Sequence, residues 1–183
     1  NIELVTEFCR KSVIERGGDP MRECLTLIRT KDGASYTCED GNYFRMYVFI
    51  EGATTYQSVR DPRDFYESAV AFGNFANLLA KFDASQLYEI LPDFHNTKVR
   101  YENFLRAVEK DICGRAEEVR SEIDWVKSRS DLCGKIVDKI ASGEIPLRVT
   151  HNDTKLNNVM LDDATGKGLA VIDLDTVMPG SLC

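Results

Sequence analysis

The chain has 183 residues, of which 43% are hydrophobic, so it can bury a core as one domain or two small lobes. Its formal net charge of -7 argues against a general nucleic-acid binder, and no apolar run approaches membrane-spanning length. The six cysteines form no Cys-x-x-Cys pair, which favours reduced thiols over a disulfide framework or zinc site, and we expect a cytoplasmic protein without a signal or transit peptide.

The N-terminal part predicts one helix followed by three strands. Apolar side chains recur every three or four residues over 1–16, and Gly17 and Gly18 end this pattern. The strands are predicted at residues 24–30, 35–39 and 43–50. Each turn between them contains Asp-Gly, which is typical of hairpins. After the third strand the pattern changes to helix.

The middle of the chain is predominantly helical. A long helix is predicted from Asp61, as N-cap, and Pro62, in the first turn, to about Phe82. Its buried stripe is expected to consist of Phe65, Ala69, Phe72, Phe75, Ala76 and Leu79. Two further helices are predicted, at 99–107 and 132–142, with a charged, solvated stretch at 108–129 between them. In the loop before them, His95 could contact a sugar or pair locally.

The region from Leu147 to Gly180 contains the strongest functional signal. Short apolar runs at 159–161 and 169–172 flank a polar turn and predict a hairpin. Asp153 and Asn158 precede the first of these strands, and Asp173 follows the second. We therefore expect the three side chains to meet at the base of the hairpin, around one ion.

The same residues resemble a known family. His151, Asp153, Lys155 and Asn158, with Asp173 15 positions after Asn158, are spaced like the catalytic loop and metal-binding Asp of the kinase fold. Asn at 152 and Ile-Asp-Leu-Asp at 172–175 resemble the aminoglycoside phosphotransferase and choline kinase family. Within it, the sequence looks most similar to N-acetylhexosamine 1-kinases.

The resemblance implies an α+β, partial protein-kinase-like fold. Residues 1–52 would form part of an N-terminal lobe, with a helix and three antiparallel strands, and 53–183 part of a helical C-terminal lobe containing the catalytic hairpin. Phe49, Ile50 and Glu51 would lie in a hinge at 49–52, where backbone groups pair with the adenine of ATP.

The resemblance also implies roles for the loop residues. Asp153 would orient the acceptor hydroxyl and take its proton, Lys155 would reach the γ-phosphate, and His151 would orient the loop by hydrogen bonding.

Two further residues would bind the metal. Asn158 and Asp173 would ligate Mg²⁺, which prefers a few hard oxygen ligands besides those of ATP. Asp175 either binds the metal as well or holds the loop.

The implied activity is that of an ATP-dependent kinase acting on a small-molecule hydroxyl, with the anomeric hydroxyl of an N-acetylhexosamine as the first candidate. A kinase for another alcohol, such as an aminoglycoside, choline or homoserine, is an alternative, and so is a catalytically dead kinase-like binding module. A sulfatase is disfavoured, because no Cys/Ser-x-Pro-x-Arg pentapeptide occurs.

Some parts of such a kinase are not identifiable. The sequence has no Gly-x-Gly-x-x-Gly and no recognisable phosphate-binding Lys, and Glu3, Glu7 and Glu15 are equal candidates for the partner of that Lys. We therefore expect an internal piece of a larger enzyme, inactive by itself, whose oligomers could be artificial.

Overall fold

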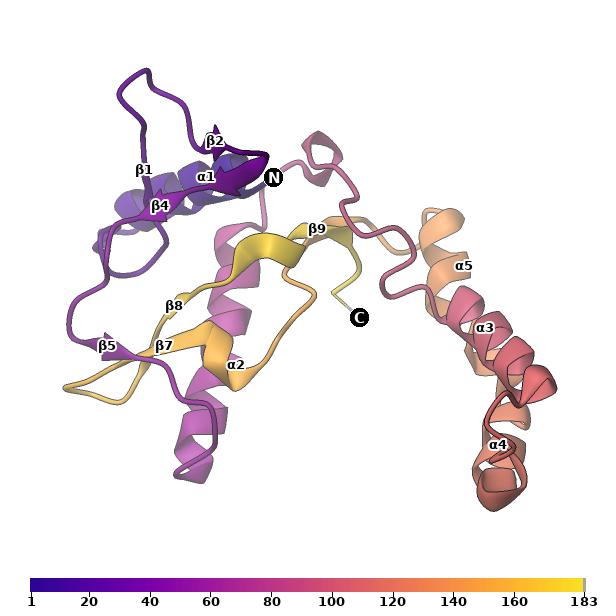
Figure 1. The fold of residues 1–183 in the computed structure, drawn as a ribbon. Helices are drawn as coiled ribbons and strands as arrows, with labels where there is room; N and C mark the ends of the chain where they lie inside the picture. The colour runs from indigo at the N-terminus through magenta and orange to yellow at the C-terminus, as the bar shows by residue number, and fades with distance from the viewer. Residues whose placement is uncertain (183) are drawn as a thin grey trace. The chain divides into compact units, whose positions relative to one another are not determined.

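The structure is a computed structural model, and it describes residues 1–182. Five α-helices and several small antiparallel sheets make up a mixed α+β arrangement in these residues. The backbone divides into two compact units (Figure 1). The first contains residues 1–88 and 148–180, and the second is built mainly from residues 89–147. The division into lobes at residue 52 stays a prediction.

The first predicted helix is confirmed. Helix α1 spans Ile2–Glu15 and buries one face through Val5, Cys9 and Val13. Gly17 follows the C-cap residue Arg16, and its φ of 78° suits a residue without a Cβ.

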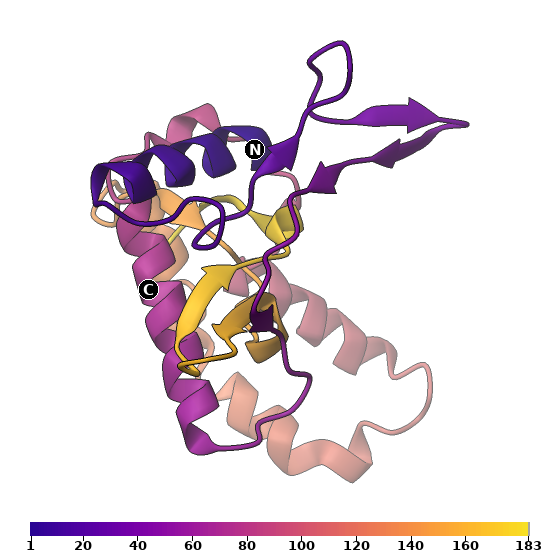
Figure 2. The same cartoon turned by 90° about the vertical axis from the view of Figure 1, so that its left-hand side faces the viewer.

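The strands after α1 differ from the prediction. They are short: β1 (Leu27–Ile28), β2 (Thr37–Glu39), β3 (Asn42–Phe44) and β4 (Met46–Tyr47). β2 pairs with β3 in a hairpin that extends away from the rest of the first unit (Figure 2), and β1 pairs with β4.

The predicted pairing of the first two strands is therefore wrong, and the predicted third strand is two strands separated by Arg45. Backbone hydrogen bonds from Gly33 to Thr30 and from Thr30 to Ala34 close a local turn, so the chain does not return along β1. All residues of β2 and β3 are exposed, so no apolar layer holds them against β1.

The linker after β4 leads into a strand that the sequence did not predict. Glu51 and Gly52 form a turn, and β5 (Ala53–Thr54) then pairs with β7 (Val159–Asp162), which in turn pairs with β8 (Gly168–Val171). The β7–β8 hairpin confirms the predicted one, with Val159 opposite Val171. A separate ladder joins β6 (Arg148–Thr150) to β9 (Met178–Gly180).

Helix α2 spans Pro62–Leu78 and packs against β7 and β8 (Figure 1). The Asp61 side chain accepts a hydrogen bond from the Arg63 N–H, which confirms the predicted N-cap. The helix ends before the predicted Phe82.

The buried face of α2 is only partly the predicted stripe. Phe75 is buried, but Phe65 and Ala69 are exposed, and Asp64 and Glu67 take their place. Burial of these two acids is compensated by polar partners. Asp64 pairs with Arg60, and Glu67 accepts a hydrogen bond from the Gly168 N–H.

The core of the first unit lies between α1, α2 and the β7–β8 hairpin. It includes the buried side chains of Val5, Cys9, Val13, Ala71, Phe75, Leu79, Val159, Leu161, Ala170 and Val171.

The second unit contains helices α3 (Thr97–Lys110), α4 (Arg120–Lys127) and α5 (Lys135–Ala141). The predicted helices at 99–107 and 132–142 correspond to α3 and α5, and α4 lies within the predicted charged stretch. Short 3₁₀ helices in the two units span Ala84–Gln86, Glu117–Val119, Ser130–Leu132, Leu156–Asn158 and Leu174–Thr176. No helix in residues 1–182 has the length and apolar character to cross a membrane.

Candidate active site

The loop between β6 and β7 is anchored by His151, which is 4% exposed. Its Nε2 lies 2.8 Å from the Ile172 carbonyl oxygen, and its Nδ1 lies 3.3 Å from the backbone nitrogen of Asp153. A carbonyl can only accept and an N–H can only donate, so both contacts are satisfied by a neutral imidazole that carries its proton on Nε2. Burial accordingly lowers the pKa of His151.

Aromatic packing fixes the same ring. The rings of Phe72 and Phe75, on α2, lie edge-on to the imidazole at centroid distances of 5.3 and 6.0 Å. The side chain therefore sits between α2 and the loop, where it can orient the loop.

Three of the predicted site residues meet in the loop. The Lys155 ammonium lies 2.7 Å from Oδ2 of Asp153, and the Asn158 amide donates to the same oxygen at 3.0 Å and to the Asp153 carbonyl at 2.9 Å. Hydrogen bonding from Lys155, followed by that from Asn158, lowers the pKa of the Asp153 carboxyl. Asp153 is therefore an ionised carboxylate, and Asn158, which donates through its nitrogen, keeps its amide oxygen for another partner.

The two ends of the hairpin are tied together. The Ile172 N–H donates to the Asn158 carbonyl at 2.9 Å, which brings Asp173 to the loop. The pKa of Lys155 is raised first by its hydrogen bond with Asp153 and also by the negative charge of Asp173. The structure thus groups Asp153, Lys155, Asn158 and Asp173 at the base of the hairpin.

Two residues of this region have unusual backbone conformations. Asn152 and Asp173 have φ angles of 67° and 60°, in the left-handed region that non-glycine residues rarely adopt. Such strain is often found at functional sites, where the surrounding structure holds it.

Asp175 is held by a residue that the sequence did not indicate. Its carboxylate forms an ion pair with Arg45, whose Nε also donates to the Tyr47 hydroxyl at 2.7 Å. Arg45 and Asp175 lie 130 residues apart in the chain, so no local pattern could have revealed the pair.

The glutamates of α1 pair with other cations. Glu3 and Glu7 both form ion pairs with Arg29, and Glu15 lies 3.9 Å from Lys11. Within residues 1–182, none of them pairs with a lysine in a strand.

The predicted metal ligands are oxygen donors. No group of three or more His, Cys, Asp or Glu side chains in residues 1–182 is arranged to hold a metal ion. The Asn158 amide oxygen and the Asp173 carboxylate nevertheless suit Mg²⁺, which is usually bound by one or two carboxylates, with waters and substrate phosphates completing its shell.

The predicted hinge residues differ in exposure. Phe49 is 78% exposed and Ile50 is buried, whereas Glu51 lies at the turn. Within residues 1–182, no hydrogen bond engages the backbone groups of Phe49 or Ile50. The backbone carbonyls of Glu51 and Gly52, in contrast, accept hydrogen bonds from the Arg22 side chain.

The structure also has a cavity of about 120 Å³ between α1, α2 and β8. Its lining includes Cys9, Cys24, Leu25, Phe75, Leu78 and Val171, and none of the predicted site residues. Burial raises the pKa of Cys9 to about 12 and that of Cys24 to about 11, so both remain thiols. The cavity therefore offers no ionised cysteine, and the candidate active site remains the group of residues in the loop between β6 and β7.

The chain was compared with models of known protein families. The family model described as the phosphotransferase enzyme family matches residues 23–183, which is more than half of the chain.

Proposed function

Because the chain belongs to the phosphotransferase enzyme family, we propose that it takes part in transfer of the γ-phosphate of ATP to a hydroxyl group of a small molecule. Membership implies a kinase-like fold and phosphoryl-transfer chemistry. The acceptor that we propose is an N-acetylhexosamine, phosphorylated at its anomeric hydroxyl, and this choice rests on the resemblance of residues 150–162 and 171–180.

The observation that carries the proposal is the arrangement at the base of the β7–β8 hairpin. An ionised carboxylate, Asp153, lies beside a cation, Lys155, and an amide, Asn158. The backbone hydrogen bond from the Ile172 N–H to the Asn158 carbonyl brings a second carboxylate, that of Asp173, to the base of the hairpin. Phosphoryl transfer requires this set: a group that orients the acceptor, and cations that neutralise charge on the phosphates.

Each residue has a distinct role in the proposed reaction. The Asp153 carboxylate accepts a hydrogen bond from the acceptor hydroxyl, aligns its oxygen with the γ-phosphorus and takes its proton late in the transfer. Lys155 releases part of its pairing with Asp153 to contact the γ-phosphate. His151 holds the loop through its two hydrogen bonds and transfers no proton.

Asn158 and Asp173 would hold Mg²⁺, which supplies positive charge to the β- and γ-phosphates when it is bound. The ion pair with Arg45 favours the loop-holding role for Asp175 over metal binding.

The nucleotide base would bind at the linker 49–52. Phe49 is exposed, and its backbone offers a donor and an acceptor that are not engaged elsewhere in residues 1–182, whereas the neighbouring Ile50 is buried and anchors the linker in the core. Adenine presents one donor and one acceptor along its edge, so an extended backbone can pair with both.

The test uses the full-length protein with Mg·ATP and N-acetylglucosamine or N-acetylgalactosamine, followed by phosphorus NMR. We expect a new phosphomonoester signal coupled to the anomeric proton. Asp153→Asn should lower the rate by about 10²-fold or more, and Asp163→Asn, which changes an exposed aspartate in the hairpin turn, should not.

The outcomes separate the candidates. A protein that binds ATP but phosphorylates neither sugar would contradict the hexosamine assignment and direct the search to other alcohols. A folded protein that does not bind Mg·ATP would contradict the kinase proposal and favour a binding module.

A further inference from the structure

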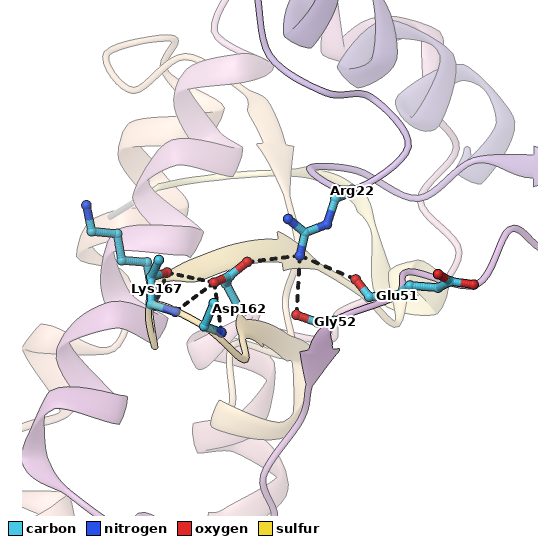
Figure 3. A network of polar contacts seen from close by, with 7 residues as sticks. Arg22, Glu51, Gly52, Asp162 and Lys167 are labelled. Atoms are coloured by element: carbon cyan, nitrogen blue, oxygen red, sulfur yellow. Dashed lines mark hydrogen bonds and ion pairs between the residues drawn. The ribbon is translucent and has the colours of Figure 1, made fainter.

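Three segments that are distant in the sequence meet around the guanidinium group of Arg22 (Figure 3). Its Nη2 lies 2.9 Å from Oδ2 of Asp162, at the end of β7, 3.2 Å from the Gly52 carbonyl oxygen and 3.3 Å from that of Glu51. One charged nitrogen thus connects the segment between α1 and β1, the linker after β4, and the β7–β8 turn.

Asp162 is held rigidly to receive this cation. Its other oxygen, Oδ1, accepts hydrogen bonds from the Thr165 N–H at 2.8 Å, the Thr165 hydroxyl at 2.9 Å and the Ala164 N–H at 3.1 Å. Hydrogen bonds from Thr165, then from Arg22, lower the pKa of Asp162 to about 2. One oxygen therefore organises the turn, and the other carries a fixed negative charge toward Arg22.

The linker has little freedom where Arg22 contacts it. The Gly52 carbonyl also accepts a hydrogen bond from the Asp163 N–H at 2.9 Å, and the next residue, Ala53, pairs with Asp162 in the sheet. Gly52 has a φ of 64°, and a Cβ there would lie 3.4 Å from the Arg22 nitrogen. The carbonyls of Glu51 and Gly52 are thereby turned toward Arg22, which leaves the backbone of the exposed Phe49 as the part of the linker that can pair with a base.

We infer that Arg22 and Asp162 form a clamp that positions residues 49–52 for the nucleotide base, a role that rests on the proposed function. The hairpin that carries Asp162 at its turn carries Asn158 and Asp173 at its other end. The clamp therefore fixes the base-binding segment relative to the groups that hold the metal and the phosphates. Arg22 is a positioning residue and contacts neither the phosphates nor the acceptor.

A clamp of this kind acts on the base and not on the triphosphate. Loss of Arg22 should free the Glu51 carbonyl, while the Gly52 carbonyl keeps its hydrogen bond from the Asp163 N–H. Residues 49–51 could then adopt other conformations, so that binding of the base must first order them. The phosphate-binding groups lie at the far end of the hairpin and keep their own hydrogen bonds.

The experiment measures dissociation constants of Mg·ATP and of Mg·tripolyphosphate, which lacks the base, with the full-length protein. Arg22→Gln should weaken Mg·ATP binding about tenfold, as expected for loss of a charge-assisted contact, and change tripolyphosphate binding less than about twofold. Arg22→Lys, which keeps a charged nitrogen with three donors, should restore most of the affinity for Mg·ATP.

The control is Arg16→Gln. Arg16 pairs with Glu23 in the same part of the chain, with side-chain exposures of 42% and 25%, against 39% and 14% for Arg22 and Asp162. This variant should leave both dissociation constants unchanged. In the double variant Arg22→Gln/Asp162→Asn, Mg·ATP binding should be no weaker than in Arg22→Gln alone, because the two residues act as one unit.

Two results would overturn the clamp. In the first, the Arg22→Gln variant binds Mg·ATP with the same dissociation constant as the unmodified protein. In the second, the Arg22→Gln variant loses affinity for Mg·ATP and for Mg·tripolyphosphate by the same factor. Failure of the unmodified protein to bind Mg·ATP at all would instead refute the proposed function, and the clamp with it.

Discussion

His151 occupies a position where a charged imidazole is disfavoured. Its Nδ1 accepts the Asp153 N–H, and protonation of that nitrogen would abolish the hydrogen bond as well as bury a charge. Because burial lowers the pKa of His151 in the folded protein, the unfolded chain binds a proton at higher pH than the folded protein does. The contribution of His151 to the free energy of unfolding should therefore be greatest above about pH 6.5, the usual histidine pKa. The free energy of unfolding should decrease as the pH falls below this value.

Denaturant unfolding between neutral pH and pH 5 would measure this slope. His151→Gln should lower stability at neutral pH but weaken the pH dependence, whereas His95→Gln, which changes the exposed histidine, should keep it. Equal slopes in all three proteins would show that His151 does not titrate differently on folding.

Asp173 and Asp175 are adjacent acids for which we propose different roles. Asp173→Asn removes a charged ligand and should raise the Mg²⁺ concentration required for half-maximal activity by about tenfold or more. Asp175→Asn removes an ion pair with Arg45 whose side chains are both partly exposed, so it should lower stability by only about 1 kcal/mol or less and leave the Mg²⁺ requirement unchanged. A Mg²⁺ titration of both variants distinguishes the roles, and an equal shift in both would assign Asp175 to the metal.

At the level of secondary structure, patterns that depend on neighbouring residues were predictable. The periodicity of α1, the cap of α2 and the turn between β7 and β8 are local features, and each is found where the sequence indicates it. The stripe of α2 was partly wrong, because spacing cannot show that Asp64 and Glu67 have partners that make their burial favourable. β5 and β9 are short strands that form only because β7 and β6 lie beside them.

The contact between α2 and β8 depends on Gly168. A Cβ at this position would lie 2.4 Å from the Glu67 carbonyl oxygen and 2.9 Å from the Ala71 Cβ, and the carbonyl belongs to a helix that cannot shift locally. Gly168→Ala should therefore destabilise the protein by about 1–3 kcal/mol, the usual cost of overpacking. Thermal or denaturant unfolding would measure it.

Gly73 provides the matched control, because it lies in α2 and a Cβ there would meet no atom within 4 Å. Gly73→Ala should stabilise the protein by about 0.5–1 kcal/mol, since alanine loses less conformational entropy in a helix. A Gly168→Ala protein as stable as the unmodified one would show that α2 and β8 are farther apart than in the structure.

At the scale of the whole molecule, the sequence predicted the α+β class and the family. The motif from His151 to Asp173 is compact in sequence, and its residues are brought together by one hairpin. The first unit, in contrast, joins residues 1–88 to 148–180 across a long interruption. Arg22, Arg45 and their partners illustrate the consequence, because each pair links parts of the chain whose proximity is set only by the complete fold.

The two units should differ in stability. Among the described residues, α3 and α5 contain no buried side chain and α4 contains only Ile123, whereas α1, α2 and the β7–β8 hairpin share a common core. Helices that bury little apolar surface open locally at low free-energy cost. Native-state hydrogen exchange on the 183-residue chain should therefore show faster exchange for amides of α3, α4 and α5 than for those of α2 and β7. Equal protection of both sets would mean that the helices of the second unit are covered by apolar contacts that the structure does not contain. Repeating the exchange measurement at several protein concentrations would then show whether a second copy of the chain supplies these contacts.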